Sequence, residues 1–150
     1  MSHRPLALAL LILGTWCAAA PLAAAEIDHV REYRDCMALA TTDPDAASEK
    51  ALSWIAFGGG EAARHCDAHA RIGLKQYAVA ATRLEELAQT TRRGRAFRAR
   101  YLAQAAQTWR LAGDDAGARA DWLALLDRAP NSAAAQAARN NLERLDVKKP

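Results

Sequence analysis

The sequence predicts an all-α fold, built as a stack of antiparallel helical hairpins. Apolar residues recur at spacings of three and four along the chain, and no stretch alternates branched and aromatic residues as a strand would. Short segments rich in Gly, Pro, Asn and Asp divide the chain into pieces of helical length. Two of these pieces also align with each other, so we expect the hairpins to repeat.

Seven helices are expected from the positions of the helix breakers and caps. Four groups of residues mark the main boundaries: Asp43 with Pro44, Gly58 to Gly60, Gly113 with Asp114, and Pro130 with Asn131 and Ser132. The expected helices cover residues 27–41, 44–57, 61–73, 75–90, 96–112, 115–129 and 132–145. Each is too short to be stable alone in water, so neighbours must pack together.

The repeat is clearest between two segments 38 positions apart. Residues 75–88 align with residues 113–126, and each segment is a turn followed by a helix with a small residue early and large apolar residues later. A small residue lets the partner helix approach closely at one end. The aligned pairs are Ala80 with Ala118, Leu84 with Trp122, and Leu87 with Leu125.

Residues 99–131 resemble a tetratricopeptide repeat, a helical hairpin of about 34 residues. The matching residues lie on both helices, in the turn and at the terminal proline: Leu102, Ala105, Ala106, Trp109, Gly113, Asp114, Ala118, Trp122, Leu125 and Pro130. The resemblance implies a right-handed superhelical stack of about three hairpins plus a carboxy-terminal capping helix, within one domain over residues 26–150. It also implies a concave wall, formed by the first helix of each hairpin, where partners bind.

The resemblance weakens toward the amino end. Residues 61–94 match in their second helix only, and residues 27–60 match only as a helical hairpin. The register of the second hairpin therefore stays open. Its first helix presents to the groove either His65 with His69, or Arg64 with Arg71.

The amino-terminal residues 1–25 predict a secretory signal peptide. Arg4 precedes the apolar run LALALLIL, and a small-residue segment ends in Ala23 to Ala25 with the A-x-A pattern of a cleavage site. The mature chain is expected to begin at Glu26, in the periplasm of a Gram-negative bacterium. The alternative is an uncleaved anchor helix from Pro5 to Ala25, which is just long enough to cross a bilayer.

Cys36 and Cys66 are the two cysteines left after removal of the leader. An even number in an exported chain favours a disulfide. The pair lies on the expected first helices of neighbouring hairpins, and the bond would close a loop of about 30 residues.

A metal site is the competing interpretation of the same segment. His65 and His69 are four residues apart on one helical face, a spacing that can chelate, and Cys66 lies beside them. Cys36 and His29 could supply further ligands. An oxidising compartment competes for both thiols, and the C-x-x-C-H pattern of a haem attachment is absent from the sequence. The sequence thus favours the disulfide and no bound metal.

Charge and motifs argue against nucleic-acid binding and catalysis. The net charge is only +3 at pH 7 and falls by one with the removal of Arg4, which predicts no nucleic-acid partner. Ser48, Ser53 and Ser132 lie in no G-x-S-x-G turn, H-E-x-x-H is absent, and no P-loop lysine follows Gly58 to Gly60. We therefore expect no enzyme activity and no cofactor.

The segment RRGRAFRAR, residues 92–100, holds five arginines in nine residues. It is either a solvated linker entering a helix or a site for an acidic partner, a protein tail or an anionic envelope surface. Arginines in a first helical turn oppose the macrodipole at a cost of about 0.3 to 1 kcal/mol each, which favours a compensating partner. The candidate binding residues come from this segment and from the groove face that the family register implies: Arg92, Arg93, Arg95, Arg100, Gln107 and Arg110.

The sequence as a whole predicts a periplasmic adaptor that binds an extended or helical segment of another envelope protein. Two alternatives stay open: a helical domain that fills its groove with its own copies, and a metal-binding protein based on the histidines. The oligomeric state, the partner and the pathway are not encoded in any recognisable motif.

Overall fold

The computed structural model describes residues 27–147, which form seven α-helices and no strand. All seven predicted helices are present, and no end differs from its predicted position by more than two residues. The predicted signal peptide lies outside the described residues. The helices are α1 (His29–Thr42), α2 (Pro44–Ala56), α3 (Gly60–Gly73), α4 (Tyr77–Thr90), α5 (Arg95–Ala112), α6 (Asp115–Arg128) and α7 (Ala133–Val147).

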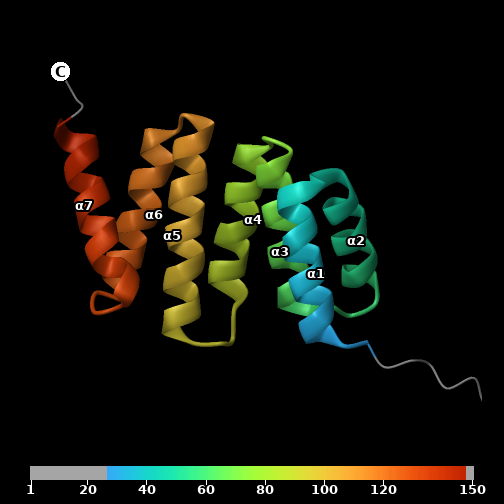
Figure 1. The fold of residues 1–150 in the computed structure, drawn as a ribbon. Coiled ribbons are helices and arrows are strands. Elements are labelled where there is room, and N and C mark those ends of the chain that lie inside the picture. Colours follow the sequence, from blue (N-terminus) through green and yellow to red (C-terminus); the bar gives the residue numbers. More distant parts are fainter. Residues whose placement is uncertain (1–26, 148–150) are drawn as a thin grey trace, which may run out of the picture.

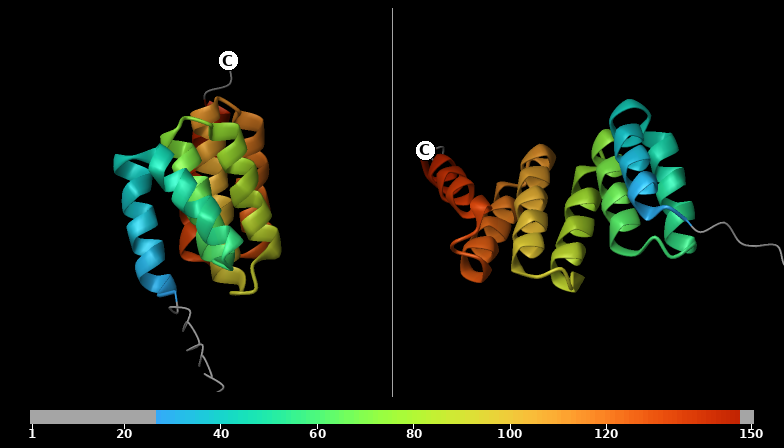
Figure 2. Two further views of the ribbon diagram at one scale, coloured as in Figure 1. Left: turned by 90° about the vertical axis from the view of Figure 1, so that its right-hand side faces the viewer. Right: turned by 60° about the horizontal axis from the view of Figure 1, so that its bottom comes forward.

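The helices follow one another along an elongated molecule, and each packs against the next in the chain (Figure 1). Successive helices run in opposite directions, so α1, α3 and α5 all begin at the same end. The helix α1 also packs on α3, and it projects from the row when the molecule is viewed along its length (Figure 2). Among the described residues, no helix has the length and apolar character that crossing a bilayer requires.

Short side chains at the helix starts explain most of the boundaries. The Asp43 carboxylate accepts a hydrogen bond from the backbone N–H of Ala46, and Pro44 occupies the first turn of α2. Gly113 ends α5 with φ of +80°, a left-handed conformation that favours glycine. Asp114 then caps α6. Ser132 corrects an expectation, because its hydroxyl is buried without a hydrogen-bond partner and does not cap α7.

The larger core joins α3 to α7. Its biggest fully buried side chains are Trp122, Leu84 and Leu87, together with Leu125. Trp109 packs partly buried against this core, whereas Pro130 is exposed. The other residues of the repeat pattern that are buried in the core region are Ala80, Leu102, Ala105, Ala106 and Ala118.

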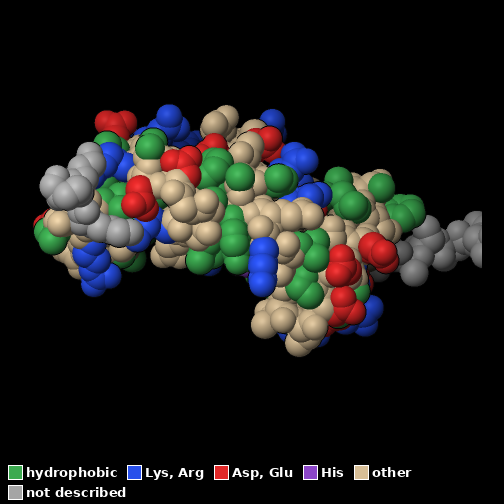
Figure 3. Space-filling model, turned by 90° about the horizontal axis from the view of Figure 1, so that it is seen from above, with side chains coloured by type: hydrophobic (Ala, Val, Ile, Leu, Met, Phe, Trp, Pro, Cys, Tyr) green, Lys and Arg blue, Asp and Glu red, His purple; other side chains and the backbone are tan. Residues whose placement is uncertain are grey.

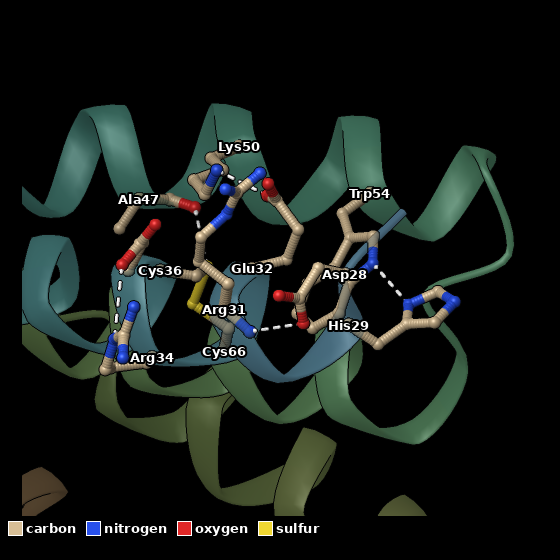
Figure 4. Close-up of polar contacts among 11 residues, drawn as sticks. Asp28, His29, Arg31, Glu32, Arg34, Cys36, Ala47, Lys50, Trp54 and Cys66 are labelled. Atoms are coloured by element: carbon tan, nitrogen blue, oxygen red, sulfur yellow. Dashed lines mark hydrogen bonds and ion pairs between the residues drawn. A yellow bond between two sulfur atoms is a disulfide. The ribbon is translucent and has the colours of Figure 1, made fainter. Parts of the chain in front are cut away.

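A smaller core joins α1 and α2 to α3. The predicted disulfide between Cys36 and Cys66 is present, with 6.1 Å between the two Cα atoms, and it links α1 directly to α3 (Figure 4). Both cysteines are fully buried and pack against Ala51. Apart from the sulfur atoms, this core is made mainly of alanine side chains.

Polar contacts join α1 and α2 (Figure 4). Lys50 of α2 donates to Glu32 of α1 over 2.5 Å, and the indole N–H of Trp54 donates to Nδ1 of His29 over 3.1 Å. Trp54 is otherwise buried, as expected of a core tryptophan. The hairpin is thus held by hydrogen bonds, an ion pair and the disulfide as well as by packing.

Candidate functional site

A cavity of about 200 Å³ lies between α1, α3 and α5, which correspond to the expected first helices of the three predicted hairpins. We call it the front cavity. Seen from above, one end of the molecule projects and the surface beside it is hollowed (Figure 3). The residues that line the cavity are Tyr33 of α1, Ala62 and His65 of α3, Arg93 of the preceding loop, and Phe97, Arg100, Tyr101 and Gln104 of α5.

The cavity exists because α3 and α5 do not pack closely against each other. The backbones of α1 and α3 are close neighbours, as are those of α4 and α5, but α3 and α5 have few close backbone contacts. Side chains span the space between them instead. The loop before α5 turns at Gly94, with φ of +91°, and places Arg93 at the rim of the cavity.

His65 forms the polar floor of the cavity. Its Nδ1 lies 2.8 Å from the Tyr33 hydroxyl, and its Nε2 lies 2.8 Å from Oε1 of Gln104. Because the Gln104 carbonyl oxygen can only accept, Nε2 carries the hydrogen and the Tyr33 hydroxyl donates to Nδ1. One side chain from each of α1, α3 and α5 is thereby fixed in a single network.

Burial keeps both histidines of α3 neutral. It lowers the pKa of His65 below its usual 6.5, and the Gln104 hydrogen bond only partly opposes this. Burial, followed by the nearby His65, lowers the pKa of His69 to about 4. The two rings lie edge to face with centroids 4.6 Å apart, and Nε2 of His69 has no hydrogen-bond partner. At neutral pH the cavity floor therefore carries no positive charge.

Glu61, at the start of α3, organises the opposite wall. Its carboxylate accepts a hydrogen bond from the Tyr101 hydroxyl over 2.6 Å and another from the Thr91 hydroxyl over 2.9 Å. Burial, and then this bond to a carboxylate, raise the pKa of Tyr101 well above its usual value of 10. Tyr101 stays protonated and holds the start of α3 to α5.

Two arginines stand at the mouth of the cavity around one aromatic ring. The guanidinium of Arg93 lies 3.6 Å from the centroid of Phe97, and that of Arg100 lies 5.3 Å from it. Arg93 also comes within 4.0 Å of a Glu61 oxygen. Arg100 makes no ion pair within residues 27–147. The mouth thus presents two exposed cations with one carboxylate between them and the core.

The structure brings only two of the predicted binding residues into the cavity. Arg93 and Arg100 line it, but Arg92 and Gln107 are exposed elsewhere. Arg95 faces a separate hollow beside Pro130, and Arg110 pairs with Asp115 over 2.8 Å at the far end of α5. Of the two registers left open for α3, the cavity contains His65, whereas Arg64 is exposed and Arg71 pairs with Asp67.

Sequence reasoning did not find the aromatic and amide residues of the site. Phe97, Tyr101 and Gln104 recur at helical spacing along α5 and form one stripe with Arg100. That spacing was available in the sequence, but the family register placed the groove face on a different stripe. Tyr33 gave no local signal, because only the projection of α1 brings it near α5.

Four of the five residues considered as metal ligands, all except His69, are used in other polar or covalent contacts. Cys36 and Cys66 are joined in the disulfide, and Nδ1 of His29 accepts from Trp54. Across the described part of the chain, no three or more His, Cys, Asp or Glu side chains are grouped so as to hold a metal ion.

The geometry of the cavity suits recognition better than proton transfer. Both ring nitrogens of His65 are engaged by Tyr33 and Gln104, so neither has a free lone pair for a ligand proton. The free polar groups at the mouth are guanidinium donors, which bind anions. Comparison with models of protein families, with curated proteins and with solved structures found no match.

Proposed function

We propose that this chain is a non-enzymatic adaptor of the tetratricopeptide type, exported to the periplasm, which binds an acidic segment of another envelope protein. The front cavity carries this proposal. It lies between α1, α3 and α5, which in a tetratricopeptide stack would be the first helices of three successive hairpins and so the wall that partners occupy. Its arginines supply the charge that an acidic segment would recognise.

The order of helix pairs supports the tetratricopeptide assignment. Each helix from α1 to α6 packs against the next one in the chain, as successive helices do in stacked hairpins, and α7 closes the row. Residues 99–131, which resemble the family motif, form α5 and α6, and their motif residues Ala106, Ala118 and Trp122 are buried where the helices meet. The proposal includes a right-handed superhelical arrangement of the hairpins.

Unbalanced positive charge supports an acidic partner. The single carboxylate of Glu61, 4.0 Å from Arg93, can balance only one of the two positive charges of Arg93 and Arg100. Neutral His65 adds no charge. An acidic segment would replace water at these guanidinium groups with charge-assisted hydrogen bonds.

Site-specific photo-crosslinking in the native envelope tests the partner. A photoreactive side chain at Ala62, in the cavity wall, is compared with one at Ala116, exposed on α6. We expect adducts specific to position 62 that disappear when Arg93 and Arg100 are both changed to glutamate. Identical adducts from the two positions, or adducts that survive the charge reversal, would contradict the proposal.

Export is tested separately by expressing the full chain in a Gram-negative host. We expect the protein in the periplasmic fraction with a mass that corresponds to a start at Glu26. Retention of the first 25 residues in a membrane fraction would favour the uncleaved anchor instead.

Self-association is the second candidate, favoured by exposed apolar side chains. Val30 is 80% exposed and Phe57 is 73% exposed, both on the first hairpin. Isolated apolar residues are common on protein surfaces, so these two alone are weak support. Light scattering across a hundredfold range of concentration separates the candidates. A mass that rises with concentration supports self-association, and a constant monomer mass contradicts it and favours the adaptor.

A further inference from the structure

We infer that the front cavity binds a small organic carboxylic acid. The carboxylate would lie at Arg93 and Arg100, and a compact apolar or aromatic body would fill the space walled by Tyr33, Ala62 and Tyr101. This inference goes beyond the proposed adaptor function and does not require it, because it concerns a ligand that the isolated protein can bind.

The size of the cavity sets the class of ligand. Pockets that hold drug-sized molecules measure roughly 300 to 1,000 Å³, whereas the front cavity measures about 200 Å³. A ligand that fits inside is therefore smaller than a drug, with a single ring or a short branched chain. Aromatic side chains and Ala62 form much of the wall, which favours an apolar body.

The charges set the ionic form of the ligand. Arg93 and Arg100 bring two positive charges, Glu61 brings one negative charge, and His65 is neutral. The local balance is one positive charge, which a monoanion neutralises. A phosphate group carries close to two negative charges at pH 7 and would be left partly uncompensated. A carboxylate also matches the planar fork of guanidinium donors.

Contacts within the protein already restrain side chains of the site. The guanidinium groups of Arg93 and Arg100 lie 3.6 and 5.3 Å from the centroid of the Phe97 ring. Gln104 is fixed at the cavity wall by its hydrogen bond to His65. These contacts reduce the ordering of side chains that binding requires, which is one of the costs of association.

Titration of simple acids into the purified mature protein tests the inference. The probes are benzoate and 3-methylbutanoate, each compared with its neutral amide, and binding is followed by NMR shifts of the Gln104 side-chain amide. We expect saturable shifts with the acids at concentrations on the order of 1 mM, since so few atoms limit affinity. The amides should bind at least about tenfold more weakly.

Matched arginine variants locate the carboxylate. Arg100→Gln should weaken benzoate about tenfold, whereas Arg95→Gln, exposed on the same helix but outside the cavity, should leave binding unchanged. Both variants should keep the melting temperature of the parent. Equal binding of acid and amide, equal losses in the two variants, or shifts that never saturate would overturn the inference.

A peptide ending in phenylalanine supplies the same chemistry from a protein chain end. If that peptide binds at least tenfold more tightly than benzoate and 3-methylbutanoate, the cavity recognises a chain end and the small-acid assignment is wrong. Weaker or equal binding supports the free acid. Failure here leaves the crosslinking result at Ala62 untouched, so the two proposals fail separately.

Discussion

The two ends of this molecule are stabilised in different ways. Around α4 to α7, large side chains such as Trp122, Leu84 and Leu125 are fully buried in one continuous core. Around α1 and α2 the buried apolar residues are mostly alanines, and a disulfide joins the first hairpin to α3. Because small side chains bury little apolar area, the amino-terminal region depends on covalent and polar links where the other depends on packing.

The difference also explains where the cavity lies. A helix held by one covalent bond and a few polar contacts need not be drawn fully into the row, and α1 projects from it. That projection carries Tyr33 to the front of α3 and forms one wall of the cavity. In the carboxy-terminal region, bulky side chains such as Trp122 and Leu125 fill the space between the helices.

The largest expected effect breaks the packed end. Trp122→Ala removes a side chain that is 1% exposed, and we expect a loss of about 3 to 5 kcal/mol in the free energy of unfolding. Chemical denaturation followed by circular dichroism measures the loss. Leu123→Ala, on the same helix but 51% exposed, is the control and should change stability by less than about 1 kcal/mol.

The next largest effect is expected from removal of the disulfide at the amino-terminal end. Changing Cys36 and Cys66 together to alanine opens a loop of 30 residues, and chain entropy predicts a loss of about 3 to 4 kcal/mol. The loss should be local. Hydrogen exchange should speed up in α1 and α2 and stay slow in α5 and α6. Uniform acceleration of exchange through all seven helices would show that the two ends unfold as one unit. The difference in their packing would then not make them differ in local stability.

Two buried groups, Asp121 and His69, should give the stability of the fold opposite dependences on pH. Burial, and then the neighbouring Glu85 carboxylate, raise the pKa of Asp121 from 3.8 to about 7. A raised carboxyl pKa stabilises the fold at low pH, and this stabilisation is lost as pH rises toward 7. We expect a loss of about 2 kcal/mol between pH 5 and pH 7 on this account, measured as the difference from Asp121→Asn.

His69 should respond with the reverse sign. Its pKa is lowered from 6.5 to about 4, so its contribution is complete above pH 6.5 and is lost as the pH falls toward 4. The free energy of unfolding of His69→Gln, relative to that of the parent protein, should therefore be higher at pH 5 than at pH 7. Identical pH profiles for the parent and both variants would show that neither buried group titrates with a shifted pKa.

The smallest expected effect on stability comes from the loop that connects the two ends. Lys75, in the loop between α3 and α4, has φ of +59°, a conformation that glycine adopts without strain. Lys75→Gly should raise stability by up to about 1 kcal/mol. Lys75→Val should lower it, because a branched side chain resists positive φ. Thermal melting of the two variants measures both changes.

Sequence periodicity predicted the helices well because each element carries its own local signals. Asp43, Gly113 and Asp114 act at the boundaries where their side chains or backbone preferences suggested. The disulfide also followed from counting, since only two of the three cysteines lie beyond the predicted leader. These features depend on a few neighbouring residues and not on how helices are placed in space.

The site was predicted only in part because it depends on the relative placement of helices. Arg93 and Arg100 were expected from the density of arginines, and they line the cavity. Gln107 and Arg110 followed from a register borrowed from the family, but the front of α5 is the stripe that includes Tyr101 and Gln104. When two neighbouring faces of a helix both carry polar residues, sequence periodicity does not show which of them lines a cavity.

The bridge from α1 to α3 has a mechanical consequence. A pull on the amino end of the chain passes from Cys36 to Cys66 through the sulfur atoms, so the force bypasses the whole of α2. The 29 residues between them cannot be extended under tension, which removes about 100 Å of extensible chain. A tether attached at that end would therefore load the start of α1 and then α3, and would leave α2 without tension.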